Sequence, residues 1–358
     1  MKVLKRLFKW TLVPIVIVAL GLFIVDKFYL SEEMNFNIKK VSNKQENKIH
    51  KINVPVDQEA KYIKISYRGK YAAYYKDNVI KIINTETKDE KTIDMSKSVD
   101  LPYYKWLPDR DILLIGEKCI SDNKGYFLKF ISYDAKRDES FELSDNNNNK
   151  VLIPLSDKSY DITDTSASTS THIMYIKISN IFSSKIYRIN IMSQLETIEN
   201  ITSKVGKISI VNREDKLIYE DRITGTINLK GYKNNYPIDT TGKLCLLSVD
   251  NEDTIYVGNK KDTKKDLNNP NKDIFVNEIW HKQLNSNSTW NKIALEKFIN
   301  KKNIYISKNG NIYVDYKDKG LIKELKTGKE TFYKGKFVGI CDYGIVSLYE
   351  GKLVGSKF

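Results

Sequence analysis

Cysteine, histidine and proline are scarce in this chain of 358 residues, which contains 3, 3 and 7 of them. The three cysteines, Cys119, Cys245 and Cys341, are far apart, form no CxxC pair and have no zinc-site spacing. Each lies in or beside an apolar run, so we expect small buried side chains. An oxidised fold that depends on many disulfides is therefore excluded.

The histidines are not arranged in the sequence as catalytic or metal-binding residues. His50, His172 and His281 have no partner at the spacing of a metal site or a catalytic triad, and we interpret each as a surface or edge-strand residue. No Gly-x-Ser-x-Gly motif is present either. The sequence therefore predicts no catalytic residue, no metal site and no cofactor, and it does not assign a binding residue.

Acidic residues are frequent, and three pairs stand in or beside predicted turns: Glu214–Asp215, Glu220–Asp221 and Glu252–Asp253. Acids are common in turns for backbone reasons, and a general acid/base pair cannot be told from turn acids without geometry. Asp145–Lys150 has the alternate oxygen ligands of a calcium loop but lacks its Gly and its distal Glu, so we predict a flexible polar loop. Thr163–Thr171 is interpreted as a mobile connection, with a hydroxyl-lined loop as the alternative.

Long apolar runs are absent from most of the chain, but one stands near its start. Trp10–Val25 carries no charge and follows the basic residues Lys2, Lys5, Arg6 and Lys9. We predict a transmembrane signal-anchor helix over residues 10–30, because a span needs about 20 mostly apolar residues. Residues 1–9 would form a cytoplasmic tail, residues 31–47 a polar tether and residues 48–358 an extracytoplasmic domain on a single-pass bacterial membrane protein.

A cleaved secretory signal is the competing interpretation of this segment, because Ala19 and Gly21 have the spacing of a cleavage site. Both residues lie inside the apolar run, however, so cleavage would leave an apolar stub from Leu22 to Val25. We therefore expect the segment to stay attached and the membrane to be a partner of the chain through this helix.

The net charge is +14, of which the four basic residues before Trp10 contribute +4 and the remainder of the chain about +10. The excess is spread over lysine-rich turns, which is typical of a solvated surface. The alternative is weak attraction to an anionic envelope polymer or lipid surface. No recognition helix or RNA-binding motif is present, so nucleic acid is not expected as a partner.

From residue 48 onward, short runs rich in Ile, Tyr, Val and Phe alternate with clusters of Gly, Asn, Asp and Lys. Many runs alternate apolar and polar residues, which is typical of strands. Leu295–Ile299 is the only short helical candidate in this part of the chain. The sequence therefore predicts an all-β domain.

A faint repeat indicates the architecture. Ile63–Asp77 and Ile304–Asp318 align without a gap and share Ile, Ser, Gly and a final Tyr-Lys-Asp. The pattern fits two strands joined by a turn in which Gly takes a positive φ. Further units begin at similar intervals, at the following residues: Tyr62, Tyr103, Tyr160, Lys207, Lys243, Asn303 and Phe337.

The spacing of these units averages about 45 residues, as in the four-stranded blades of a β-propeller. The last unit has three plausible strands, and we expect Ile49–Val54 to supply the fourth and close the ring. The prediction is a seven-bladed propeller, with six or eight blades as alternatives.

Two segments carry a family resemblance. ISYRGKYAAYYKD (65–77) and YKWLPDRDILLI (104–115) resemble the propeller repeats of TolB-like proteins and of the N-terminal domain of dipeptidyl peptidase IV. The resemblance is clear over residues 62–143 and 303–333. It implies a ring-shaped interaction platform. It does not imply peptidase activity, because the nucleophile elbow of those peptidases is absent and the chain ends at Phe358.

Three functions follow as hypotheses. The first is a non-enzymatic binding module for a protein or an anionic envelope polymer. The second is a propeller enzyme that acts on a glycan or peptide, which would need two or three carboxylates converging at one mouth of the central funnel; a funnel lined by Lys, Asn and Tyr would contradict it. The third is a sensory or regulatory ectodomain.

Overall fold

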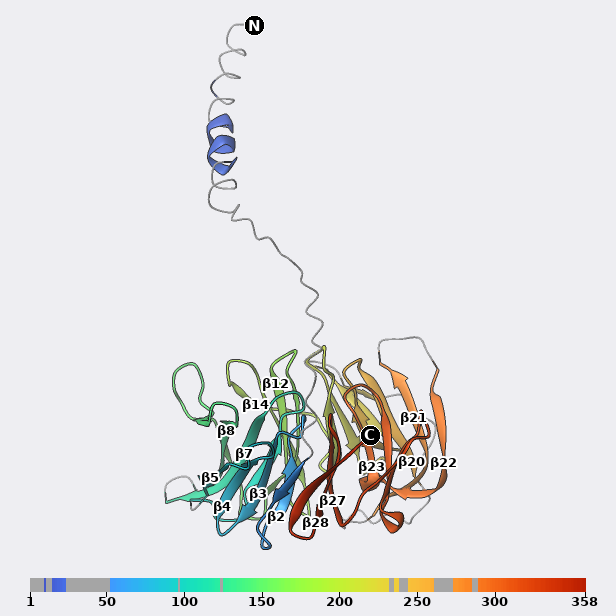
Figure 1. The fold of residues 1–358 in the computed structure, drawn as a ribbon. Helices are drawn as coiled ribbons and strands as arrows, with labels where there is room; N and C mark the ends of the chain where they lie inside the picture. The colour runs from blue at the N-terminus through green and yellow to red at the C-terminus, as the bar shows by residue number, and fades with distance from the viewer. Residues whose placement is uncertain are drawn as a thin grey trace. The chain divides into compact units, whose positions relative to one another are not determined.

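The computed structural model describes residues 10, 15–23, 52–95, 97–122, 125–231, 235–237, 244–260, 273–284 and 289–358. The chain divides into two compact units, Met1–Ile49 and His50–Phe358. In the second unit the described strands form seven antiparallel sheets, which are the blades of a β-propeller (Figure 1). The predicted all-β, seven-bladed propeller is confirmed.

In the first unit the described helical residues are Trp10 and Ile15–Phe23. Among the described residues no helix has the length and apolar character needed to span a membrane. This finding contradicts the transmembrane helix predicted over residues 10–30 and the single-pass membrane location, and it gives no support to the membrane as a partner.

The blades are numbered here in chain order. Blade 1 consists of β2 (Lys61–Ile65), β3 (Tyr71–Lys76), β4 (Val79–Asn84) and β5 (Glu90–Asp94). Blade 2 consists of β6 (Tyr103–Trp106), β7 (Ile112–Ser121), β8 (Gly125–Asp134), β9 (Glu139–Glu142) and β10 (Leu152–Pro154). Blade 3 consists of β11 (Asp161–Ser168), β12 (Ile173–Ser179), β13 (Ser184–Ile189) and β14 (Leu195–Thr197). Blade 4 consists of β15 (Val205–Ile210), β16 (Leu217–Asp221), β17 (Ile227–Lys230) and β18 (Asn235–Pro237). Blade 5 consists of β19 (Leu244–Val249), β20 (Thr254–Lys260), β21 (Phe275–Gln283) and β22 (Asn291–Asn300). Blade 6 consists of β23 (Ile304–Ile306), β24 (Ile312–Tyr316), β25 (Leu321–Glu324) and β26 (Glu330–Phe332). Blade 7 consists of β27 (Lys336–Cys341), β28 (Gly344–Tyr349), β29 (Lys352–Lys357) and β1 (Asn53–Pro55). Short 3-10 turns, η2 (Lys301–Asn303) and η3 (Lys317–Lys319), flank β23 and β24.

The first strand of every blade begins within a few residues of a predicted unit start. One local prediction is wrong, because Leu295–Ile299 lies within strand β22 and is not a helix. Pairing with β21, in which Ile299 stands opposite Val276, determines its conformation. Tertiary pairing thus overrides the local helical pattern.

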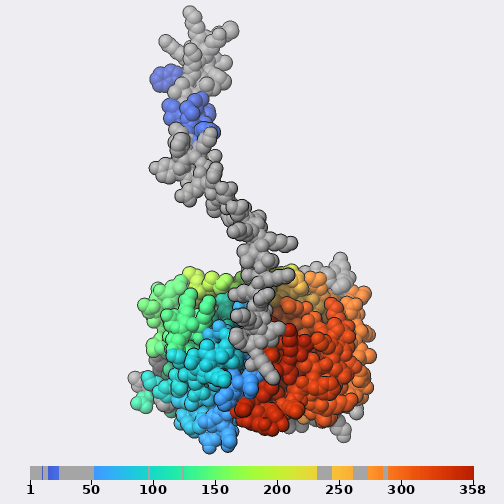
Figure 2. Space-filling model, viewed as in Figure 1, coloured from blue at the N-terminus to red at the C-terminus, as the bar shows by residue number. Residues whose placement is uncertain are grey.

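The N-terminal strand closes the ring, as predicted. Strand β1 pairs antiparallel with β29, and Val54 stands opposite Leu353 with neither side chain exposed. The first and last blades therefore lie side by side, blue against red in Figure 2. The strand begins at Asn53, and residues 49–51 of the predicted segment, His50 among them, lie outside the described residues.

The hydrophobic core is divided among the spaces between neighbouring blades. The described residues form seven apolar clusters, and each joins two adjacent blades. Between blades 1 and 2, for example, Tyr71 stacks on Trp106 with 6.3 Å between ring centroids. Because each blade is covered on both faces, most side chains of its second strand are buried, which explains the Ile- and Tyr-rich runs of the sequence.

The sequence repeat has a physical basis in its turn. Ser66 Oγ accepts the N–H of Tyr71, and Ser307 Oγ accepts the N–H of Asn311, at 3.1 and 3.0 Å. Gly69 and Gly310 both adopt a φ of +77°, which an L side chain rarely takes. The shared Ser and Gly therefore specify the tight turn from the first strand to the second strand of a blade.

Candidate functional site

The first strands of the blades surround the centre of the ring, and β2, β11, β15, β19 and β23 each contact the first strand of a neighbouring blade. Residues from β6, β11, β15 and β19, together with Lys308 just after β23, line one cavity of about 200 Å³. A space that touches the inner edges of five blades lies at the propeller axis. We call it the channel.

Lysines on the first strands join one blade to the next around the channel. Lys64 Nζ donates to the Tyr104 carbonyl oxygen at 2.5 Å, and Lys105 Nζ donates to the Thr165 carbonyl oxygen at 2.6 Å. Lys207 Nζ makes the same kind of bond to Leu247. Each ammonium retains further N–H groups for a ligand after this single bond.

The channel is rich in uncompensated positive charge. Among its described lining residues, Lys207 and Lys308 have no carboxylate within ion-pair distance, and Lys105 Nζ is 3.7 Å from Asp164 Oδ1. Lys64, on β2, does not line the cavity and also has no carboxylate at that distance within the described chain. Burial, with a contribution from Lys105, lowers the pKa of Lys64 to about 8. The pKa values of Lys207 and Lys308 are lowered as well, chiefly by burial. These cations would gain from an anion placed among them.

Asp164 is the one carboxylate that lines the channel within the described residues. Its Oδ2 atom accepts the N–H of Ile208 at 3.1 Å, which joins blade 3 to blade 4. The carboxylate is therefore engaged with backbone and lysine. The converging acids that the enzyme hypothesis requires are not found among the described lining residues.

A second space of about 360 Å³ adjoins the channel and shares Pro108, Ala167 and Lys308 with it. We call it the mouth. Its other lining residues lie mostly on turns between first and second strands: Asp109, Thr169, Ser170, Asn212, Arg213 and Asn251.

The threonine- and serine-rich segment Thr163–Thr171, predicted to be a mobile connection, has a different structure. Most of it belongs to strand β11, so the mobile connection is wrong. Thr165 and Ser166 line the channel, and Thr169 and Ser170 line the mouth. Hydroxyl groups of the segment thus line both spaces, as in the hydroxyl-lined alternative, but most of the segment is a strand and not a loop.

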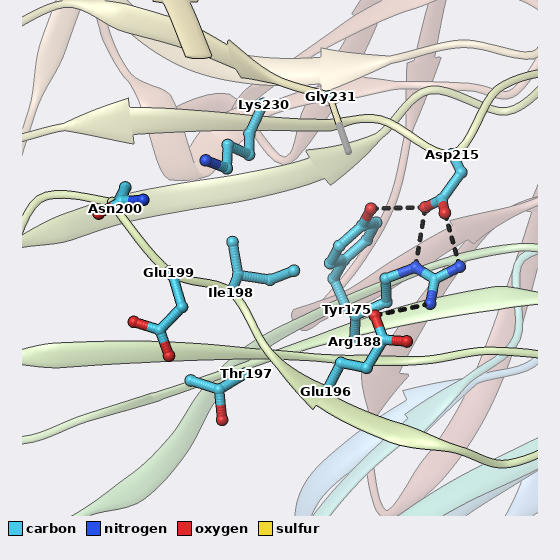
Figure 3. Close-up of a pocket in the computed structure, with 10 residues that line it drawn as sticks. All are labelled: Tyr175, Arg188, Glu196, Thr197, Ile198, Glu199, Asn200, Asp215, Lys230 and Gly231. Atoms are coloured by element: carbon cyan, nitrogen blue, oxygen red, sulfur yellow. Dashed lines mark hydrogen bonds and ion pairs between the residues drawn. The ribbon is translucent and has the colours of Figure 1, made fainter. Parts of the chain in front are cut away.

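A further hollow of about 250 Å³ lies between blades 3 and 4, and we call it the blade 3–4 hollow. Figure 3 shows the Arg188 guanidinium between the carboxylates of Asp215 and Glu196, with the Tyr175 hydroxyl also directed at Asp215. Arg188 Nη2 is 2.6 Å from Asp215 Oδ2, and Tyr175 donates to Asp215 Oδ1 at 2.7 Å. These opposite charges are paired, so Arg188 and Asp215 form an ion pair that joins blade 3 to blade 4. The hollow therefore offers fewer unpaired charges to a ligand than the channel does.

The other acid pairs also connect neighbouring blades. Glu220 is fully buried, with Lys260 Nζ at 2.9 Å and Lys301 Nζ at 3.3 Å from its oxygens. Burial alone would raise the pKa of Glu220, but the two lysines lower it to about 2. Asp253 accepts the backbone N–H of Asn212 at 2.6 Å. The structure places these acids in inter-blade contacts, which sequence spacing could not reveal.

The remaining predicted positions lie away from the channel lining. His172 is exposed at the start of β12, whereas His281 in β21 stacks on Tyr256 with 5.6 Å between ring centroids. Asp145 Oδ1 accepts the N–H groups of Asn147 and Asn149, so this loop is a hydrogen-bonded turn. The three cysteines are buried and unpaired, as predicted.

Sequence reasoning missed the lysines of the channel. Lys64, Lys105 and Lys207 each stand in a first strand beside apolar residues, and that recurrence is the one sequence signal that could have revealed them. Whether such a lysine faces the axis or the outside depends on the register and twist of its strand, which composition does not show.

No protein-family profile matches this chain. No curated protein matches it either. Similar solved structures include dipeptidyl peptidase 4 from Porphyromonas gingivalis, at 12% identity over 76% of this chain and 44% of that one, with a TM-score of 0.42. TolB from Acinetobacter baumannii matches at 12% identity over 76% of this chain and 62% of its own, with a TM-score of 0.43.

The β-propeller domain of Cps50 (Swd1) from Myceliophteria thermophila matches at 11% identity over 84% of this chain and 97% of its own, with a TM-score of 0.49. The chain spans less than two thirds of the length of the peptidase and of TolB. The resemblance to TolB-like and dipeptidyl-peptidase-IV-type propellers thus holds at the level of the fold alone, and the seven-bladed architecture rests on the strand pairings.

Proposed function

We propose that this protein is a non-enzymatic binding module that takes an anionic group of its ligand into the channel. The carrying observation is that Lys207 and Lys308 line one cavity without a carboxylate at ion-pair distance, within the residues described. Cations held together in a confined space repel one another, and a bound anion relieves that repulsion. A carboxylate- or phosphate-bearing protein or polymer has the required chemistry.

A propeller enzyme that works through channel carboxylates receives less support. Asp164 accepts the Ile208 N–H and lies beside Lys105, and no second carboxylate among the described lining residues of the channel faces it. Asp109, in the mouth, is exposed and paired with Arg110 at 3.2 Å.

Calorimetric titration with inorganic tripolyphosphate tests the proposal. Replacement of Lys105 and Lys207 by Met should weaken binding by roughly 10-fold or more per lysine, because each removes a charge-assisted hydrogen bond. The matched control replaces Lys326 and Lys329, two exposed lysines on the turn between β25 and β26, by Met and should bind as the wild type does.

Circular dichroism of both variants checks that the propeller remains folded. Binding to the wild type should weaken as ionic strength rises. Absence of binding, or equal affinity of the folded double variant and the wild type, would overturn the proposal.

A further inference from the structure

The mouth presents neutral polar side chains that an anion in the channel does not use. Thr169, Ser170 and Asn251 line it, and Ser170 and Asn251 are exposed. No side-chain hydrogen bond joins these three residues to another group within the described chain, so their hydroxyl and amide groups are available to a ligand.

The frame that holds these groups is fixed. Asn212 Nδ2 donates to the Asp250 carbonyl oxygen at 2.5 Å, and Ser168 Oγ donates to the Asn212 carbonyl oxygen at 2.7 Å. Arg213 is paired with Glu252 at 2.5 Å. The backbone on both sides of the mouth is therefore positioned by contacts between blades, while its outermost side chains stay unengaged.

The mouth and the channel select for different chemistry in one ligand. A phosphate or carboxylate only accepts hydrogen bonds, which matches the lysines. Thr, Ser and Asn both donate and accept, which matches a hydroxyl group. Spaces of about 200 and 360 Å³ that share Lys308 also suit a compact ring with substituents.

We propose that the ligand is an anionic carbohydrate, a sugar bearing a carboxylate or a phosphate. Its hydroxyl groups lie against Thr169, Ser170 and Asn251, and its anionic group lies between Lys105 and Lys207. This assignment rests on the proposed function, since it deepens the chemistry of the same channel.

The test compares two calorimetric probes with equal numbers of carboxylates on the full-length protein. Trigalacturonic acid carries sugar hydroxyls, and N-acetylated, amidated triglutamate does not. Trigalacturonic acid should bind about 10-fold more tightly, as expected for two or three additional hydrogen bonds. Replacement of Thr169 by Val, Ser170 by Ala and Asn251 by Ala should reduce this ratio to about 2-fold or less while triglutamate binding is retained.

The control variant replaces Ser140 and Asn146, exposed residues of blade 2, by Ala and should keep the full ratio. The affinity for glucose 1-phosphate, compared with that for inorganic phosphate, tests whether the anionic group of the sugar is a phosphate. Tighter binding of the sugar probe in either pair supports the assignment. Equal binding of the sugar and non-sugar probes in both pairs would overturn the carbohydrate assignment and leave the anion site standing. Absence of binding by all four probes would overturn both.

Discussion

Lys105 Nζ donates a hydrogen bond to the Thr165 carbonyl oxygen, 2.6 Å away on the next blade. Lys64 and Lys207 make equivalent bonds to blades 2 and 5. The same side chains therefore join the blades and supply positive charge at the propeller axis. Because one carbonyl accepts only one of the three ammonium N–H groups, each lysine keeps further N–H groups that can bind an anion.

Closure of the ring through β1 predicts strong sensitivity at Val54. Replacement of Val54 by Asp places an unpaired charge in the unexposed space beside Leu353 and should lower the free energy of unfolding by about 3–5 kcal/mol. Replacement of the adjacent, exposed Asn53 by Asp should change it by less than about 1 kcal/mol. Urea unfolding followed by tryptophan fluorescence measures both, and equal effects would contradict closure by this strand.

The buried Glu220 predicts an acid-dependent loss of stability. Its pKa is lowered to about 2, so its charged form contributes stability above about pH 4.5 that is lost as the pH falls toward 2. Replacement of Glu220 by Gln leaves Lys260 and Lys301 without their partner and should reduce stability at pH 7 by about 3–5 kcal/mol.

The difference between wild type and this variant should shrink as the pH is lowered from 5 to 3. Replacement of the exposed Glu139 by Gln is the matched control and should produce neither effect. Urea unfolding at each pH provides the measurement, and a difference that does not depend on pH would contradict the assigned role of Glu220.

Lys177 predicts a second rise of stability with pH, in the alkaline range. Burial lowers its pKa to about 8, and its ammonium donates to the Gly206 carbonyl oxygen at 2.5 Å. Between about pH 8 and 10 the unfolded chain binds more protons at this residue than the folded chain, so its contribution to stability rises with pH. Replacement of Lys177 by Met should remove up to ~3 kcal/mol of that rise. Denaturant unfolding from pH 7 to 10 measures it, with replacement of exposed Lys326 by Met as control.

The three cysteines should be unreactive in the folded protein. All are buried, and burial raises the pKa values of Cys245 and Cys341 to about 11 and also raises that of Cys119. Because the thiolate is the reactive form, Ellman's reagent should label no thiol under native conditions and all three in denaturant. Replacement of the exposed Ser140 by Cys should add one rapidly labelled thiol. Rapid native labelling of the wild type would contradict the buried placement.

The sequence by itself determined the repeat, the number of blades and the closing strand. These features depend on local patterns: alternating apolar residues, a Ser and a Gly at a turn that needs positive φ, and a last unit one strand short. Periodicity could not decide the conformation of Leu295–Ile299, because pairing with β21 determines it. Apolar composition over residues 10–30 likewise did not establish a spanning helix in the described chain.

The tertiary structure alone decided what lies at the axis. Glu220 and Asp253 read as turn acids in the sequence, yet they meet partners on neighbouring blades. Lys105, Lys207 and Lys308 are separated by more than one blade in sequence and line one cavity. Ring closure brings them together, and the register and twist of each strand determine which side chains face inward; neither can be read from the residues one at a time.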